Sequence, residues 1–320
     1  MNFENLFSPP YRISRINDYA QRDPVGFLQE SDAWYDAQVM HTAEMILENR
    51  SSSPIVLLSG PSGSGKTTTA KKLAQALYTH GVRTHTISMD DYFLSRDEYE
   101  VPLAEDGTPD LESPLCMDME LLNDHFTRLS AGETVLVPSF DFTTQSRNAE
   151  PSLTLHLAKD EVAVFEGIHA LNDEITLAHP EAFKLYISAS ADVVDDDGAA
   201  VMRGSWVRLI RRSIRDHLFR GSAPENTIRM WGNVCAGEEK YITPFIGKAD
   251  FRFNTHLPYE ICCVNDLAAA LFETLPENVD RLHELRRIRP NIQLFADIDP
   301  ALVAPDSLLR EFIGGGIYEY

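Results

Sequence analysis

The pattern of hydrophobic and polar residues that begins at residue 55 predicts a strand, a loop and a helix in that order. A short apolar run, IVLLS over residues 55–59, is followed by a glycine-rich turn and then by TTTAKKLAQALYTHG, a helix-forming sequence. Gly81 is placed to end this helix, and RTHTISM over residues 83–89 alternates as a second strand does. The pattern therefore predicts a β-α-β unit that begins at residue 55.

The same reasoning predicts the other elements. Residues 161–167 and 184–188 are apolar on both faces, as buried parallel strands are. Apolar residues recur at helical spacing in four further segments, namely residues 34–47, 117–132, 206–219 and 227–241. Shorter strand signals lie at TVLVPSF (134–140), LTLHL (153–157), FRFNT (251–255) and YEICCV (259–264). Another helix and a proline-interrupted tail are expected past residue 268.

The chain of 320 residues divides into three expected parts: a helical N-terminal extension (1–50), a main α/β domain (51–268) and a helical C-terminal tail (269–320). Its 43% hydrophobic and 24% charged residues are typical of a globular protein. No apolar run approaches the length of a membrane span, and the N-terminus lacks the layout of a signal peptide. A cytoplasmic protein without a membrane partner is expected.

Charge and cysteine content limit the partners further. Against 28 Lys and Arg stand 49 Asp and Glu, and the net charge of −21 opposes binding to nucleic acid. Any site for a polyanion must be local. Cys116, Cys235, Cys262 and Cys263 show no CxxC spacing and are expected to be reduced core residues, the last two on opposite faces of a strand.

The strongest chemical signal is GPSGSGKT over residues 60–67, which satisfies the phosphate-binding pattern GxxxxGK[ST] between a predicted strand and a predicted helix. Its glycines let successive backbone N–H groups point at a phosphate, and the helix adds its positive end. Lys66 is expected at the β and γ phosphates and Thr67 at Mg²⁺. The expected ATP-binding residues of this segment are Gly60, Pro61, Ser62, Gly63, Ser64, Gly65, Lys66, Thr67 and Thr68.

A phosphate-binding loop alone does not separate kinases from GTPases, transport ATPases and helicases. The chain has no guanine-reading NKxD or TKxD, which argues against a GTPase. LSAGE over residues 129–133 resembles a transporter signature, but it follows the loop too closely and ends a predicted helix. A small-molecule kinase remains.

Acidic residues follow two predicted strands. Asp90 and Asp91 come after the strand at 83–89, and Glu166 ends the strand at 161–167. Carboxyl ends of parallel strands face the ligand crevice, so these side chains are expected near the phosphates. Asp90 could accept a proton from an attacking hydroxyl or hold Mg²⁺, and Glu166 could lie near the metal. The alternative is solvated acids at the ends of strands.

A basic helix stands out in this acidic chain. Arg208, Arg211, Arg212 and Arg215 fall on one helical face, and Arg220 follows. They could form a solvated surface or pair with carboxylates. Because arginine forks suit phosphate oxygens, the stripe instead predicts a lid that closes on ATP.

Together these motifs resemble the uridine kinase and phosphoribulokinase family of P-loop kinases over residues 54–264. The resemblance is carried by GPSGSGKTT, SMDDYF, DLESPLCMD, PSFDFTTQSR, VFEGIHAL and RLIRRSIRDHLFRG. Residues 237–260 look like the uridine kinase-like nucleoside kinases.

The resemblance implies roles for single residues. Asp90 matches the family's general base, with Lys66 and Arg215 as further catalytic residues, and Glu166 matches its second acid. Arg211, Arg215 and Arg220 match the lid arginines, and Glu112 matches the ribose-binding acid. Phe140 and Gln145 stand where the family has Tyr and His readers of the pyrimidine, while Asp141 and Arg147 are retained. The replaced readers leave the base open.

The sequence thus predicts an α/β P-loop NTPase fold, with a parallel sheet, helices on both faces, an acceptor flap near residues 97–116 and an Arg-rich lid. The predicted activity is ATP- and Mg²⁺-dependent transfer of the γ-phosphoryl group to a nucleoside hydroxyl. Alternatives are a kinase for a sugar phosphate or a pantothenate-like alcohol, and a nucleotide-binding regulator, which would have no need of a base at Asp90. Self-association into a homo-oligomer is left open.

Overall fold

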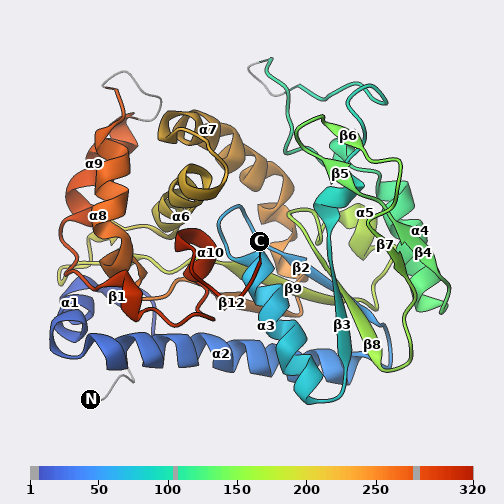
Figure 1. Cartoon of the computed structure of the whole chain (residues 1–320), viewed down its shortest axis with the longest axis horizontal. Helices are drawn as coiled ribbons and strands as arrows, with labels where there is room; N and C mark the ends of the chain where they lie inside the picture. The colour runs from blue at the N-terminus through green and yellow to red at the C-terminus, as the bar shows by residue number, and fades with distance from the viewer. Residues whose placement is uncertain (1–6, 104–106, 277–281, 320) are drawn as a thin grey trace.

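The computed structural model of the protein describes residues 7–103, 107–276 and 282–319, so parts of the expected extension, flap and tail lie outside it. Its central sheet has the strand order β12-β9-β2-β8-β3, with every pairing parallel (Figure 1). These strands are β2 (Ile55–Ser59), β3 (Arg83–Ser88), β8 (Glu161–Glu166), β9 (Phe183–Ser188) and β12 (Phe251–Asn254). The predicted α/β architecture is confirmed.

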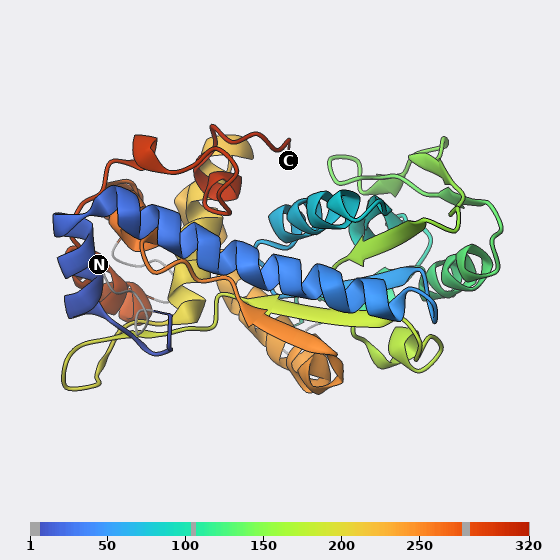
Figure 2. The same cartoon turned by 90° about the horizontal axis from the view of Figure 1, so that it is seen from below.

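Alternate residues of the sheet enter two separate cores. On β2, Val56 and Leu58 pack on the side of α2 (Pro24–Asn49) and α3 (Lys66–Thr79), and Figure 2 shows α2 lying along the sheet. Leu57 packs on the side of α4 (Met119–Ser130) and α5 (Asp173–Thr176). Helices therefore cover both faces, as predicted.

The N-terminal segment contains more than the one predicted helix. A two-residue strand, β1 (Tyr11–Arg12), pairs with β10 (Val193–Val194), which pairs with β11 (Ala200–Met202). A strand this short shows no alternation in the sequence, so it was not expected. It leads into α1 (Ile13–Arg22), and α2 then extends well beyond the predicted 34–47.

The prediction of a strand at residues 259–264 is wrong, because this segment begins α8 (Glu260–Glu273). All six residues are buried, and a helix buried on every side loses the periodicity that separates it from a strand. Cys262 and Cys263 are therefore helical neighbours rather than residues on opposite faces of a strand. Both are buried and unpaired, as is Cys116, while Cys235 is half-buried.

Of the shorter strand signals, residues 251–255 contain β12 of the central sheet, and residues 134–140 and 153–157 contribute to two small antiparallel pairs beside it. β4 (Val135–Val137) pairs with β7 (Leu153–Leu155), and β5 (Phe140–Asp141) pairs with β6 (Ser146–Arg147). The 3₁₀ segments in the described chain are η1 (Met89–Tyr92), η2 (Pro114–Cys116), η3 (Thr243–Lys248) and η4 (Pro300–Leu302). η1 directly follows β3 and carries the predicted base.

The basic segment forms α6 (Gly204–Phe219), which packs against α7 (Pro224–Tyr241) and α8. The tail continues through α9 (Leu282–Ile292) to α10 (Arg310–Ile313). α10 returns to the middle of the molecule and packs on α6 (Figure 1). The expected domain boundary at residue 268 falls inside α8. Ile16 and Leu308, from the two terminal segments, belong to the same core as Val56 and Leu58 of β2. No helix of the described chain is long and apolar enough to span a membrane.

Candidate active site

The glycine-rich loop joins the end of β2 to the start of α3. Gly65 precedes the helix with φ +88°, a conformation that residues with a Cβ rarely adopt. Lys66 lies at the first turn, where its Nζ donates to the carbonyl oxygen of Gly60 at 2.9 Å. The Ser64 amide also donates to the Pro61 carbonyl oxygen at 3.1 Å, so the loop is a compact turn at the start of α3, as a phosphate-binding loop is.

This loop forms one wall of a cavity of about 410 Å³. Of the loop residues predicted to bind ATP, Ser62, Gly63, Gly65, Lys66 and Thr67 line the cavity. The other four do not line it: Pro61, Ser64 and Thr68 are buried, and the Gly60 carbonyl oxygen accepts from Lys66.

Thr67 and Glu166, two of the residues that the sequence predicted near the metal, lie side by side and form what we call the metal corner. The Thr67 hydroxyl donates to Oε1 of Glu166 at 3.3 Å, because the register of β8 against β2 places Glu166 opposite Leu58. Burial raises the pKa of Glu166 to about 7, although nearby Lys66 acts in the opposite direction. A cation beside this carboxylate would favour its ionised form.

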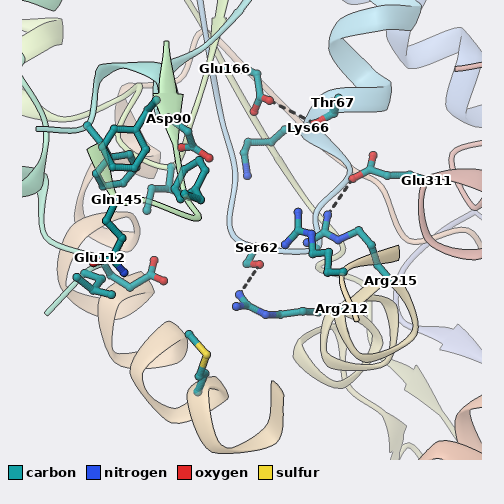
Figure 3. Close-up of a pocket in the computed structure, with 18 of the residues that line it drawn as sticks. Ser62, Lys66, Thr67, Asp90, Glu112, Gln145, Glu166, Arg212, Arg215 and Glu311 are labelled. Atoms are coloured by element: carbon teal, nitrogen blue, oxygen red, sulfur yellow. Dashed lines mark hydrogen bonds and ion pairs between the residues drawn. The ribbon is translucent and has the colours of Figure 1, made fainter. Parts of the chain in front are cut away.

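Asp90 enters the same cavity from η1. The Ser88 hydroxyl accepts the Asp90 amide at 3.2 Å and so starts the turn at the end of β3. Figure 3 shows Asp90, Lys66 and Glu166 directed into one space. Asp90 is open to the cavity, but the surrounding protein desolvates it and raises its pKa, against the opposing charges of Lys66 and Arg220. β8 separates β3 from β2, so the two motifs meet across one intervening strand.

The flap brings Glu112 to the opposite side of the cavity. Its segment is held to α7 by the Tyr241 hydroxyl, which donates to Oδ2 of Asp110 at 2.7 Å. A Cβ on Gly237 of α7 would lie 2.5 Å from the Cβ of Glu112, so only glycine allows this approach. Desolvation raises the pKa of Glu112, and the positive charge of Arg212 opposes that effect.

An aromatic wall adjoins Glu112. Phe93, Phe140 and Phe142 pack together with ring centroids 5.0 to 5.9 Å apart, and all three line the cavity. Gln145 also lines it and has φ +53°, the one positive φ among non-glycine residues of the described chain. Such backbone strain gathers at functional sites.

Asp141 and Arg147 do not line the cavity, although sequence placed them with the acceptor residues. The Asp141 carboxylate accepts the Thr143 amide at 2.8 Å, which lowers its pKa. Arg147 donates to the carbonyl oxygens of Tyr92 and Phe93 and pairs with Asp118 at 3.0 Å. Arg147 therefore fixes the segment that follows Asp90.

The basic helix divides its arginines between cavity and core. Arg215 and Arg220, which sequence assigned to ATP, line the cavity, and so does Arg212, which sequence had placed on the stripe without assigning it to ATP. Arg212 donates to Oγ of Ser62 at 2.9 Å (Figure 3). Desolvation lowers the pKa of Arg215, and Glu311 opposes the shift.

Arg211 does not reach the cavity. Its side chain is 2% exposed and donates to both carboxylate oxygens of Glu260, at 2.6 and 2.9 Å. It also donates to the carbonyl oxygens of Gly63 and Thr255, at 3.1 and 2.7 Å. With its donors directed at these partners, Arg211 braces the loop from behind.

Glu311 of α10 was missed in the sequence, because no motif surrounds it. Its carboxylate accepts the Thr68 amide at 3.2 Å and the Thr68 hydroxyl at 2.6 Å, and it pairs with Arg215 at 3.3 Å. The C-terminal tail is thus part of the cavity wall. Among the described residues, five cationic and four acidic side chains line the cavity, so cations are concentrated here in a chain of net charge −21.

Comparison with known proteins identifies the family. Residues 55–259 match the model of the "Phosphoribulokinase / Uridine kinase family". The chain is 32% identical over 177 residues to a uridine kinase of Deinococcus deserti, covering 55% of this chain and 75% of that protein. It is 30% identical over 182 residues to a uridine kinase of Anoxybacillus flavithermus, covering 57% and 76%.

A solved structure of a kinase assigned to a fructose transport system in Silicibacter sp. TM1040 has a TM-score of 0.47 and 19% identity, over 67% of this chain and 98% of that one. The family model, by contrast, spans well over half of this chain. The chain therefore belongs to the phosphoribulokinase and uridine kinase family of P-loop kinases, and it is a phosphotransferase that acts on an alcohol group.

Proposed function

We propose that this enzyme transfers the γ-phosphoryl group of ATP, with Mg²⁺, to a hydroxyl of a nucleoside. One observation carries the proposal: the phosphate-binding loop, the carboxylate of Asp90 and the aromatic wall at Phe140 all line the same cavity. A donor phosphate and an acceptor hydroxyl can therefore meet beside a base. The chemistry of such a transfer is mainly positioning and neutralisation of charge.

The loop amides and Lys66 would bind the β and γ phosphates of the donor. Lys66 now contacts the Gly60 carbonyl oxygen, so its ammonium exchanges that partner for a phosphate. Arg212 and Arg215 approach from the lid side, where guanidinium donors suit phosphate oxygens (Figure 3). These cations would offset the charge that spreads over the transferring group.

The residues at the metal corner fit Mg²⁺. The Thr67 hydroxyl and the carboxylates of Glu166 and Asp90 are oxygen donors, and Mg²⁺ uses few protein ligands beside phosphates and water. When bound, Mg²⁺ supplies positive charge at the phosphate oxygens.

Asp90 would take the proton of the acceptor hydroxyl. A general base works best when its pKa lies near the working pH, and desolvation moves the pKa of Asp90 upward in that direction. The positive charges of Lys66 and Arg220 oppose this rise in the pKa of Asp90.

The acceptor wall suits a nucleoside. The Phe140 ring offers a stacking face for a base, and Gln145 offers one donor and one acceptor group. Glu112 faces them with a carboxylate that can accept from two neighbouring hydroxyls. A vicinal diol, as in ribose, is the expected acceptor feature.

Arg96 favours a second candidate, a sugar phosphate acceptor. Its side chain lines the cavity, and its amide donates to the Gln145 carbonyl oxygen at 3.0 Å. A cation at that place could bind an acceptor phosphate. Sugar phosphates therefore belong in any acceptor screen.

The test compares initial rates on ribonucleosides, 2′-deoxyribonucleosides and sugar phosphates, with product identification. We expect ribonucleosides to react faster than the deoxy forms, and Glu112→Gln to remove most of that preference. Glu100→Gln, an exposed acid of the same flap, is the matched control. Equal rates for ribo and deoxy forms would contradict the assignment of Glu112 to the acceptor site. Turnover of sugar phosphates alone would contradict the nucleoside and favour a sugar phosphate as the acceptor.

A further inference from the structure

A second cavity, of about 420 Å³, lies beside the first one. Four residues line both cavities: Thr67, Arg215, Arg220 and Glu311. The remaining wall comes from the end of α6 and from the C-terminal tail, at Phe219, Arg310, Gly314, Gly315, Gly316 and Tyr318. Apart from Phe219, this added wall lies outside residues 55–259, the part that matches the family.

The shared residues determine which ligand could occupy both spaces. Thr67 directly follows Lys66 in the phosphate-binding loop, and Arg215 and Arg220 come from the lid. A ligand whose phosphates lie at the loop can therefore place the group at the end of its phosphate chain in the tail cavity. A nucleoside triphosphate is such a ligand, since its ribose and base are joined to one end of the phosphate chain.

The chemistry of the tail cavity suits a planar base. Phe219 is 56% exposed, although it is a large aromatic residue, and its ring borders the cavity. Gly314 passes so close to this ring that a Cβ would lie 2.7 Å from its edge. One flat apolar face is thus kept open for stacking.

Polar groups are available beside that face. Gly314 and Gly315 have φ values of +77° and +71°, which glycine adopts freely. Within the described chain, the backbone amides and carbonyls of Gly315 and Gly316 make no hydrogen bond. An amide donor and a carbonyl acceptor side by side can pair with the edge of a purine.

The tail is held firmly against the kinase body. Phe312 is fully buried beneath the guanidinium groups of Arg211 and Arg215, at 5.0 and 5.7 Å from its ring centroid. Arg310 donates to the carbonyl oxygens of Val303 and Gly314, and the Tyr318 hydroxyl donates to Gln75 of α3 at 2.7 Å. The cavity is therefore a built feature of the fold.

We propose that the C-terminal segment 310–318, together with Phe219, forms the pocket for the purine base of the phosphoryl donor. The proposal rests on the proposed function, because it takes the phosphates to lie at the loop. The C-terminal tail, which lies outside the part of the chain that matches the family, would then bind the nucleotide directly.

The test measures the affinity of the full chain for ADP and for inorganic tripolyphosphate, which has phosphates but no base. Phe219→Ala should weaken ADP binding about tenfold, the effect of one lost stacking contact, and leave tripolyphosphate binding unchanged. Leu218→Ala is the control, because Leu218 is exposed and does not line the cavity. Melting temperatures of both variants report whether the fold is kept.

Each other outcome would overturn the proposal. Unchanged ADP affinity in Phe219→Ala would show that the base lies elsewhere, and equal weakening of both ligands would show that Phe219 acts on the phosphates. If the wild-type chain bound neither ligand, the proposed function itself would fail. If it bound tripolyphosphate as tightly as ADP, the phosphate site would stand without a base pocket.

Discussion

Arg211 and Arg212 are neighbours in α6, yet their replacement should affect different properties of the protein. Arg211→Met removes the buried partner of Glu260, which is itself 1% exposed. Among the described residues, the Glu260 carboxylate then keeps the Leu257 amide as its hydrogen-bond donor, at 3.0 Å, and lies 3.6 Å from Nε2 of His256. Breaking a buried ion pair from one side costs about 3 to 5 kcal/mol of unfolding free energy.

That cost can be expressed as a melting temperature. The entropy of unfolding is about 2.1 cal/mol/K per residue, so 320 residues give about 0.7 kcal/mol/K. The melting temperature of Arg211→Met should therefore lie about 4 to 7 °C below that of the wild type. Arg212→Met loses one hydrogen bond to Ser62 and a 3.4 Å contact with Asp216. The Asp216 carboxylate keeps Arg220 and Thr227 as partners. The stability of Arg212→Met should fall by about 1 kcal/mol or less, while the rate of phosphoryl transfer should fall about 10²-fold.

Calorimetry and initial-rate kinetics on both variants test this contrast. The double variant Arg211→Met/Glu260→Leu should regain part of the lost stability, because it leaves no buried charge unpaired. The reasoning would be refuted if Arg211→Met melted like the wild type and lost activity as Arg212→Met does. Arg211 would then act on the nucleotide rather than on the loop.

Two further predictions concern the phosphate loop and the metal corner. Lys66→Ala should abolish phosphoryl transfer with an unchanged melting temperature, since the hydrogen bond of its Nζ within the described chain is to the Gly60 carbonyl oxygen alone. Exposed Lys159→Ala is the control, and near wild-type turnover of Lys66→Ala would contradict the loop assignment. For Glu166 the raised folded pKa, about 7 against 4.5, means that the metal-free protein loses stability as pH rises from about 4.5 to 7. Glu166→Gln should remove this loss, so its unfolding free energy relative to wild type should rise by about 2.5 kcal/mol between urea titrations at pH 5 and pH 8; an equal difference at both pH values would contradict it.

The sequence was most informative where the chemistry is local. The loop at residues 60–67 is contiguous, and its glycines and Lys66 identify it together with the strand and helix beside it. Asp90 and Glu166 could be placed because Glu166 ends one strand of the parallel sheet and Asp90 directly follows the end of another. The position of each then follows from the order of strands.

Sequence reasoning was weaker where distant segments meet. Helical spacing put Arg211 and Arg212 on one face, but the partner that draws Arg211 into the core, Glu260, lies 49 residues away. Glu311 reaches Thr68 across 243 residues and belongs to no motif. The strand predicted at 259–264 failed for a related reason, since burial on all sides comes from neighbours that the local pattern does not contain.

The most direct test of the account is the rate of phosphoryl transfer in Asp90→Asn, with binding of ATP measured on the same protein. Asn keeps the shape of Asp90 and removes its ability to take a proton. We predict that the rate of nucleoside phosphorylation falls about 10² to 10⁴-fold, while ATP affinity changes little. Asp91→Asn serves as the control, because Asp91 accepts the Phe140 amide and does not line the cavity. Full transfer by Asp90→Asn, or the same loss in Asp91→Asn alone, would contradict the assignment of the base.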